Sequence, residues 1–368
     1  MPDVTIGERE TSGFAPFRGD APSCRPLMPR EGGQGADDLA GLALGLIWNQ
    51  SRQWDTGSEW EDVVVITEPT EANNPYRAGF CCLVGRPNAG KSTLTNALVG
   101  SKIVITSAKP QTTRHAVRGI VTRPDAQLIL VDTPGLHRPR TLLGQRLNDV
   151  VRSTLSDVDV IGFCIPADQK IGPGDRFIAA ELAGLRAPTV AIVTKTDTVS
   201  RDQVAAQLIA VSRLGDFADI VPVSAVEDVQ VDVLADVLVS HLPEGPVLYP
   251  DGVLTDNDSE TRIAELIREA ALEDVRDELP HSIAVTIDEI RPREGRPDIT
   301  EIFATIHLER TSQKGIIIGA KGARLRDIGT NARAAIESLL GGRVHLDLHV
   351  AVESDWQRDP KKLDRLGF

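Results

Sequence analysis

Short apolar runs alternate with amphipathic stretches between about residues 77 and 242. The apolar runs predict strands at 79–84, 116–123, 127–132, 158–164, 189–193 and 219–223. Helical periodicity predicts helices between them, for example at 201–213 and 229–241. Strands that alternate with helices form mostly parallel sheets covered by helices. We therefore expect an α/β domain whose ligand site lies beyond the carboxyl ends of its strands.

The pattern changes at residues 243–258, where turn-forming residues predict an ordered linker. Beyond the linker, the expected order is one helix, two strands, a broken helix and a final strand. These elements are predicted at 261–275, 281–290, 300–308, 313–340 and 342–352. The order predicts a smaller α+β domain over residues 259–368, after the α/β domain over residues 77–242.

Residues 1–76 differ from the rest of the chain because they are rich in Gly, Pro, Asp and Glu. We expect a disordered extension with one short helix at 39–48. We also expect residues 1–72 to contribute nothing to the chemistry of the following domains. A start codon assigned too far upstream would explain such a segment. The alternative is a docking tail that uses an amphipathic element at 39–60.

The composition restricts the cellular setting. A net charge of −13 argues against general binding of polyanions, so any nucleic-acid site must be a local basic patch. The four cysteines (Cys24, Cys81, Cys82 and Cys164) show no CxxC spacing, which favours a reducing compartment and no cysteine metal site. No apolar run is long enough to span a membrane, and no basic leader precedes one. We expect a cytoplasmic protein.

One glycine-rich stretch follows the first predicted strand and matches the phosphate-binding pattern G-x-x-x-x-G-K-[ST]. It consists of Gly85, Arg86, Pro87, Asn88, Ala89, Gly90, Lys91 and Ser92, with Thr93 next in the helix. The glycines allow backbone N–H groups to point at phosphate oxygens, and the helix adds its positive dipole end. Lys91 is expected to contact the β and γ phosphates, and Ser92 to ligate Mg²⁺. The alternative is a glycine-rich turn that binds nothing.

Two further segments suit the metal and the γ-phosphate. Asp132 ends a predicted buried strand and begins the sequence Asp-Thr-Pro-Gly, so its carboxylate can hold Mg²⁺ through water. The N–H of Gly135 can then sense the γ-phosphate. In the polar segment 111–115 we prefer Thr113 over Thr112 as the residue that closes over the metal. The alternatives are an ordinary turn and a solvated loop.

A third group of residues suits guanine. In Thr194-Lys195-Thr196-Asp197, the Asp197 carboxylate can accept hydrogens from guanine N1 and N2, which adenine cannot offer as a pair. The stem of Lys195 can lie along the base, and a backbone N–H at Ser224-Ala225 can meet guanine O6. Each of these signals is weak alone, and their order after one phosphate loop makes the joint signal strong.

This set of motifs resembles the translation-factor-like GTPases. The usual guanine motif begins with Asn, so Thr194 implies a slightly looser base site. Leu136 occupies the position where Ras-like proteins place a water-orienting Gln, which implies slow intrinsic hydrolysis. The resemblance also implies that Asn88 helps to hold a K⁺ ion in place of an arginine finger. The alternative for Asn88 is an amide that only stabilises its loop.

The C-terminal region carries a candidate RNA site. Gly319-Ala320-Lys321-Gly322 matches the G-x-x-G loop of a KH domain, in which two glycines let a nucleic-acid backbone approach a helix end. Residues 310–326 are basic and contain no acidic residue. Their cations are Arg310, Lys314, Lys321, Arg324 and Arg326. The alternative is a glycine kink between two packed helices.

The combined order of domains resembles the Era family of bacterial GTPases over about residues 77–368. Further similar segments are 242–245, 248–251, 265–269 and 355–368. The resemblance implies a monomeric GTPase that uses Mg²⁺. It also implies binding of small-subunit ribosomal RNA near its 3′ end, a role in small-subunit assembly, and peripheral association with the inner membrane face. The alternatives are a switch for protein partners and a metabolic nucleotide hydrolase.

Overall fold

The computed structural model describes residues 75–107, 109, 112–137, 139, 141–273, 275 and 279–368. The expected disorder of residues 1–76 and the short helix at 39–48 therefore lie outside the described residues, apart from residues 75 and 76. Residues 69–368 form one compact unit. Within the described part of this unit, no helix is long and apolar enough to cross a membrane.

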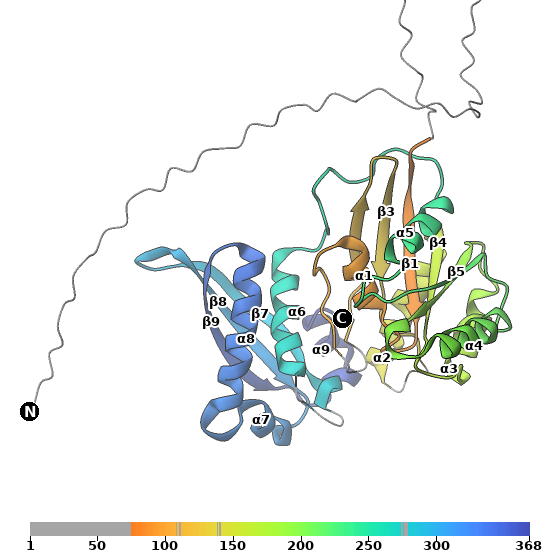
Figure 1. Cartoon of the computed structure of the whole chain (residues 1–368). Helices are drawn as coiled ribbons and strands as arrows, with labels where there is room; N and C mark the ends of the chain where they lie inside the picture. Colours follow the sequence, from red (N-terminus) through yellow and green to blue (C-terminus); the bar gives the residue numbers. More distant parts are fainter. Residues whose placement is uncertain are drawn as a thin grey trace, which may run out of the picture. The chain divides into compact units, whose positions relative to one another are not determined.

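The first domain contains a six-stranded sheet with helices between its strands (Figure 1). Its elements are β1 (Arg77–Gly85), α1 (Lys91–Val99), β2 (Val117–Thr122), β3 (Ala126–Asp132), α2 (Leu142–Ser156), β4 (Val160–Pro166), α3 (Pro173–Leu182), β5 (Thr189–Thr194), η1 (Thr196–Thr198), α4 (Arg201–Ser212), β6 (Asp219–Pro222) and α5 (Val231–Ser240). The strand order is β2-β3-β1-β4-β5-β6. Only β2 runs antiparallel to its neighbour, so the predicted mostly parallel α/β sheet is confirmed.

Both faces of this sheet are buried, which explains why its central strands are apolar without alternation. Cys81 and Leu83 point into a core that includes Leu94 of α1 and Leu234 of α5. The alternate residues of β1, such as Val84, point into a second core formed with α2, α3 and α4. Successive side chains of a strand alternate between faces, so one apolar strand serves both cores.

The predicted linker at 243–258 contacts the first domain. The side-chain oxygen of Gln127 accepts hydrogen bonds from the N–H groups of Leu248 and Tyr249, both at 2.8 Å. The Gln127 amide nitrogen donates to the Tyr249 carbonyl oxygen at 2.9 Å. Further along, the Ile120 N–H on β2 donates to Leu254 O at 2.9 Å. Gln127 is fully buried, so these bonds satisfy a polar group inside the fold.

The second domain has the order α-β-β-α-α-β predicted from the sequence. Its elements are α6 (Ser259–Leu272), η2 (Leu279–Ser282), β7 (Ala284–Arg293), β8 (Arg296–Leu308), α7 (Thr311–Ile318), η3 (Ala320–Gly322), α8 (Ala323–Leu340) and β9 (Arg343–Val352). β8 pairs antiparallel with β7 and parallel with β9. Ile302, Ala304 and Ile306 alternate along β8 and pack in one core with residues of α6 and α8.

Two short elements close the chain, η4 (Trp356–Arg358) and α9 (Pro360–Arg365). They pack against the first domain. Trp356 and Leu363 share an apolar cluster with Leu143 and Leu147 of α2. Arg146 of α2 donates to Phe368 O at 2.5 Å. The sequence indicated no helix here, because a six-residue helix gives too few turns for a periodic signal.

Candidate functional site

The glycine-rich loop connects β1 to α1 in a conformation that requires its glycines. A Cβ atom at Gly85 would lie 2.6 Å from the Cys164 carbonyl oxygen, and Gly90 has a positive φ of 88°. α1 begins at Lys91, so its N-terminus is directed at the loop. The Lys91 ammonium lies 3.4 Å from Gly85 O and 3.3 Å from Arg86 O. Burial lowers the pKa of Lys91, against the opposing charge of Asp132.

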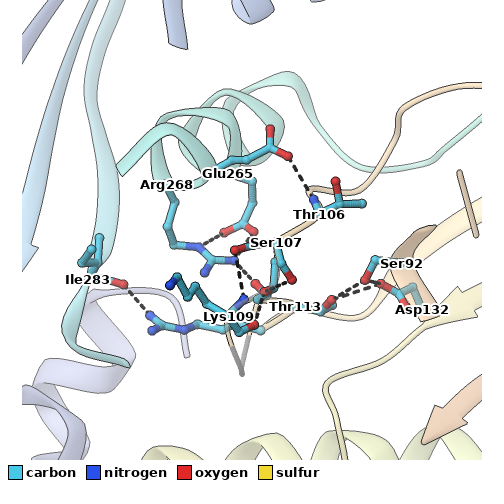
Figure 2. A network of polar contacts seen from close by, with 12 residues as sticks. Ser92, Thr106, Ser107, Lys109, Thr113, Asp132, Glu265, Arg268 and Ile283 are labelled. Atoms are coloured by element: carbon cyan, nitrogen blue, oxygen red, sulfur yellow. Dashed lines mark hydrogen bonds and ion pairs between the residues drawn. The ribbon is translucent and has the colours of Figure 1, made fainter. Parts of the chain in front are cut away.

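Three oxygen-bearing side chains from three separate segments meet beside the loop. Ser92 Oγ lies 2.7 Å from Asp132 Oδ2 and 2.8 Å from Thr113 Oγ1, and Thr113 Oγ1 lies 3.1 Å from the same Asp132 oxygen (Figure 2). The other Asp132 oxygen is buried without a hydrogen-bond partner among the described residues. Burial raises the pKa of Asp132, while Lys91 and the two hydroxyl groups oppose that rise. Hard oxygen ligands with an unsatisfied carboxylate oxygen fit Mg²⁺.

The segment after Asp132 lies close against the glycine-rich loop. A Cβ atom at Gly135 would lie 2.7 Å from Pro87 N, so only glycine allows this approach. Leu136 is 2% exposed and belongs to the core beneath the sheet. Its side chain therefore fills the core and offers no polar group to the nucleotide side. One pocket includes Thr113, Gly135 and residues 87–93 of the loop in its lining.

Side-chain hydrogen bonds link the two predicted guanine segments to each other and to the phosphate loop. Thr194 Oγ1 donates to Ala89 O at 2.7 Å, which joins the base loop to the phosphate loop. Ser224 Oγ donates to Asp197 Oδ1 at 2.6 Å. This contact gives Ser224 a side-chain role that the sequence analysis did not include. Lys195 has a positive φ of 59°, and its ammonium lies 3.5 Å from Asp168.

The G-x-x-G loop separates α7 from α8 and has a left-handed backbone. The φ angles are 70° at Gly319, 50° at Lys321 and 77° at Gly322. A Cβ atom at Gly319 would lie 3.0 Å from the Arg324 backbone nitrogen. Lys321 is exposed beside Ala320, whereas Arg324 donates to Glu273 O at 2.7 Å.

A groove of about 380 Å³ begins at Gly322 and runs between α8 and β9. Its lining includes Arg326, Arg333 and His345. Of the predicted RNA residues, Gly322 and Arg326 line this groove, whereas Lys314 lies on α7. Arg333 and His345 lie outside the basic stretch at 310–326, so charge clustering along the sequence could not identify them.

A polar network that no sequence pattern indicated joins the loop that carries Thr113 to the second domain. Arg268 on α6 donates to the Thr112 carbonyl oxygen. Arg114 donates to Ile283 O at 2.6 Å and lies over the rings of Trp356 and Phe368. Burial lowers the pKa of Arg114 to about 9, so it stays charged at neutral pH. The residues that meet are more than 150 positions apart, and no local pattern indicates such contacts.

Family comparisons agree with this geometry. A family model described as 50S ribosome-binding GTPase matches residues 80–195, and a KH-domain model matches residues 278–357. The GTPase Era of Streptomyces coelicolor is 66% identical over 315 residues, which cover 83% of this chain and 99% of that protein. The chain belongs to the Era family of GTPases. As an Era-family protein it binds and hydrolyses GTP, so the predicted activity and both predicted domain types are confirmed.

Two solved Era structures resemble the chain over the same region. One is Era in complex with MgGDPNP and nucleotides 1506–1542 of 16S ribosomal RNA. It is 37% identical, with a TM-score of 0.77, and the match covers 79% of this chain and 99% of that chain. A variant of Aquifex aeolicus Era bound to GDP·AlF4⁻ is 36% identical, with the same TM-score and coverage. The Era fold therefore spans both described domains.

Proposed function

We propose that this GTPase binds small-subunit ribosomal RNA near its 3′ end and acts in assembly of the small ribosomal subunit. The observation that carries the proposal is the match, over both domains, to Era in complex with MgGDPNP and nucleotides 1506–1542 of 16S ribosomal RNA. We further propose that GTP favours RNA binding and that hydrolysis favours release. Such a protein would work in the cytoplasm. Monomeric state and peripheral membrane association stay predictions.

We propose the following roles at the nucleotide. Ser92 and Thr113 would ligate Mg²⁺ directly and Asp132 would hold it through water. The bound metal would neutralise charge on the β and γ phosphates. Lys91 turns from the loop carbonyls to the phosphates, and the Gly135 N–H meets the γ-phosphate. The proposal is supported by the distances of 2.7–3.1 Å among the three oxygen-bearing side chains.

We propose that Asp197 reads guanine, with Lys195 along the base and a backbone N–H of Ser224-Ala225 near O6. The hydrogen bond from Ser224 to Asp197 supports this proposal, because it orients the carboxylate while both of its oxygens keep lone pairs that can accept hydrogens from the base. Thr194 is assigned the structural link to Ala89.

We propose that Asn88 helps to hold K⁺ during hydrolysis. Asn88 is exposed at the loop, has a left-handed φ of 63°, and lies in the lining of the pocket beside the phosphate loop. The burial of Leu136 supports the need for another source of transition-state charge, because that position offers no polar side chain.

We propose that RNA crosses the G-x-x-G loop and the groove beyond it. Positive φ angles at Gly319 and Gly322 and the exposure of Lys321 support close approach of a phosphate backbone. Lys314, Arg324 and Arg326 would add charge around the loop. The alternative is a switch for protein partners, and the RNA-binding experiment described next separates the two functions.

The test measures binding of a fluorescent RNA with the sequence of the 3′ end of small-subunit RNA, in GDPNP and in GDP. Gly319→Asp with Gly322→Asp should abolish binding while GDP affinity is kept. Because Gly319 has little room for a side chain, Lys321→Glu with Arg326→Glu tests the same surface without crowding the loop.

The matched control is Arg201→Glu, an exposed charge reversal on α4 of the GTPase domain. It should leave RNA affinity within about twofold, and the effects of the basic-loop variants should shrink as salt rises. RNA binding by the parent protein that both pairs of substitutions leave intact would favour the protein-partner switch.

A further inference from the structure

The loop that carries Thr113 is attached to the second domain on both sides of that residue. The carbonyl oxygen of Thr112 accepts a hydrogen bond from Arg268 Nη2 on α6. On the other side, Arg114 Nη1 donates to Ile283 O at 2.6 Å. Between these two contacts, the Thr113 hydroxyl points to Ser92 and Asp132 (Figure 2). The second domain thus holds the backbone of Thr112 and the side chain of Arg114, the two neighbours of a candidate metal ligand.

Arg268 is oriented before it reaches the loop. Its Nε and Nη2 atoms lie 2.9 and 2.5 Å from the two carboxylate oxygens of Glu265, one turn earlier on α6. Burial acts to raise the pKa of Glu265, but the charge and hydrogen bonds of Arg268 outweigh it, so the pKa lies below its usual value. The carboxylate therefore stays ionised, and a two-point contact leaves the planar guanidinium little freedom to rotate.

Side-chain packing around Thr113 is too open to position it without the hydrogen bond from Arg268 to Thr112. Thr113 and His115 line a cavity of about 480 Å³ whose other walls include Leu266 of α6 and Leu339 of α8. A side chain at the edge of a cavity is poorly constrained by van der Waals contacts on that side. Besides the contacts of its own hydroxyl with Ser92 and Asp132, the position of Thr113 therefore depends on the hydrogen bonds of Thr112 and Arg114.

A second contact from α6 reaches the start of the same loop. Glu269 accepts a hydrogen bond from the Thr106 N–H at 3.0 Å, and its other oxygen lies 2.6 Å from Lys102 Nζ. Adjacent residues of one helix, Arg268 and Glu269, therefore bind a carbonyl oxygen and an N–H at opposite ends of the loop 106–112. A displacement of α6 would move both ends together.

We propose that Arg268 is a positioning residue for GTP hydrolysis: held by Glu265, it fixes Thr112 so that Thr113 stays in register with Ser92 and Asp132. The GTPase centre is then complete only when α6 of the second domain is in contact with the loop. This inference rests on the proposed role of Thr113 as a metal ligand. GDP lacks the γ-phosphate that a closed loop contacts, so GDP binding should depend little on Arg268.

The experiment compares Arg268→Gln with the parent in the full-length protein. We expect kcat for GTP to fall by about 10–100-fold, the range for a small misplacement of a catalytic group. GDP affinity should stay within about twofold, and the Mg²⁺ concentration for half-maximal rate should rise. Arg268→Lys keeps one donor and the charge but loses the two-point contact, so it should recover part of the rate.

The matched control is Arg262→Gln, which removes one cation from the same helix. Arg262 belongs to none of the ion pairs found among the described residues, and its substitution should leave kcat unchanged. Rates are compared well below the melting temperature of each variant, measured by circular dichroism. A purely structural contact would lower the melting temperature of Arg268→Gln and leave kcat and the Mg²⁺ requirement of the folded protein unchanged, which would overturn the proposal.

A further arm separates this inference from the assignment on which it rests. Thr113→Val should lower kcat and raise the Mg²⁺ requirement, because it replaces the hydroxyl with a methyl group of similar size that cannot ligate a metal. If Thr113→Val has the full rate, the metal assignment and the inference both fail. If Thr113→Val is slow while Arg268→Gln is not, only the role of Arg268 fails.

Discussion

The hydroxyl of Thr194 donates to the carbonyl oxygen of Ala89 at 2.7 Å, across 105 positions of sequence. Thr194 is 3% exposed and Ala89 is 1% exposed, so no bulk water replaces this bond if it is lost. A Thr at this position is expected to give a looser base site. Its hydroxyl nevertheless joins the loop at 194–197 to the phosphate loop.

Thr194→Val should weaken GDP binding, because valine keeps the shape and leaves the buried carbonyl unsatisfied. The cost of such a group is about 1–3 kcal/mol, and about tenfold in affinity is a central expectation. Thr194→Ser keeps the hydroxyl and is the control. The measurement is the dissociation constant of a fluorescent GDP analogue. Equal affinities for the Val and Ser variants would show that the link does not support the base site.

Asp197→Asn should change base preference from guanine to xanthine, because an amide can donate to the xanthine oxygen and cannot accept both guanine hydrogens. Bonds to a charged group contribute about 1.5–3 kcal/mol each, so GTP affinity should fall by at least about tenfold. XTP affinity should rise. Competition of XTP, GTP and ATP against labelled GDP measures the change, and an unchanged order of affinities would remove Asp197 from base recognition.

Hydrolysis should be faster in K⁺ than in Na⁺, and Asn88→Ala should reduce the difference. The increase in rate with K⁺ should not exceed the effect of an arginine finger, which is about 10³–10⁵-fold. Single-turnover cleavage of GTP at equal ionic strength gives the rates directly. Identical rates in the two salts would instead indicate that an activating partner supplies the charge.

Stability of the second domain should decrease as the pH falls below about 6.5, in part through His307. Burial lowers the pKa of His307 from 6.5, an effect that Arg365 and His349 reinforce and Glu353 and Asp288 oppose. Between the pKa of His307 in the folded protein and 6.5, the unfolded chain binds a proton that the folded chain excludes. The free energy of unfolding therefore decreases as the pH is lowered through that window. Above about pH 6.5 this contribution is complete.

Urea unfolding between pH 5 and pH 8 tests the effect, with His307→Gln as the comparison. The His307 ring nitrogen Nε2 lies 2.9 Å from Thr286 Oγ1, and a glutamine amide can keep such a contact without titrating. The variant should show a smaller loss of stability between pH 6.5 and pH 5. Parallel profiles for the two proteins would exclude His307 as a source of the pH dependence.

Local patterns were sufficient to predict the fold, and the candidate nucleotide residues were chosen from the same kind of pattern. The phosphate loop, the Asp132 turn and the Asp197 segment each have residue types set by the backbone or by the ligand, and each follows a strand. Hydrophobic periodicity likewise predicted the order of elements in both domains. Such signals extend over a few residues, which is why a single sequence contains them.

Contacts between distant segments could not be predicted in the same way. Arg268 meets Thr112 across 156 positions, and Arg114 meets Ile283 across 169. In the sequence, Arg268 is one arginine on an amphipathic helix, a residue type that is usually exposed. Its burial follows from how the two domains pack, and no residue near it in the sequence indicates that packing.

The linker has a further consequence for β2, which lies at one edge of the six-stranded sheet. Gly119 forms an isolated bridge with Thr255, and Ile120 donates to Leu254 O at 2.9 Å. An uncovered edge strand is a template for edge-to-edge association and aggregation. A GTPase domain truncated after Leu242 would expose the edge of β2 and should self-associate. A domain truncated after Asp256 would keep the linker residues Leu254 and Thr255 that cover this edge.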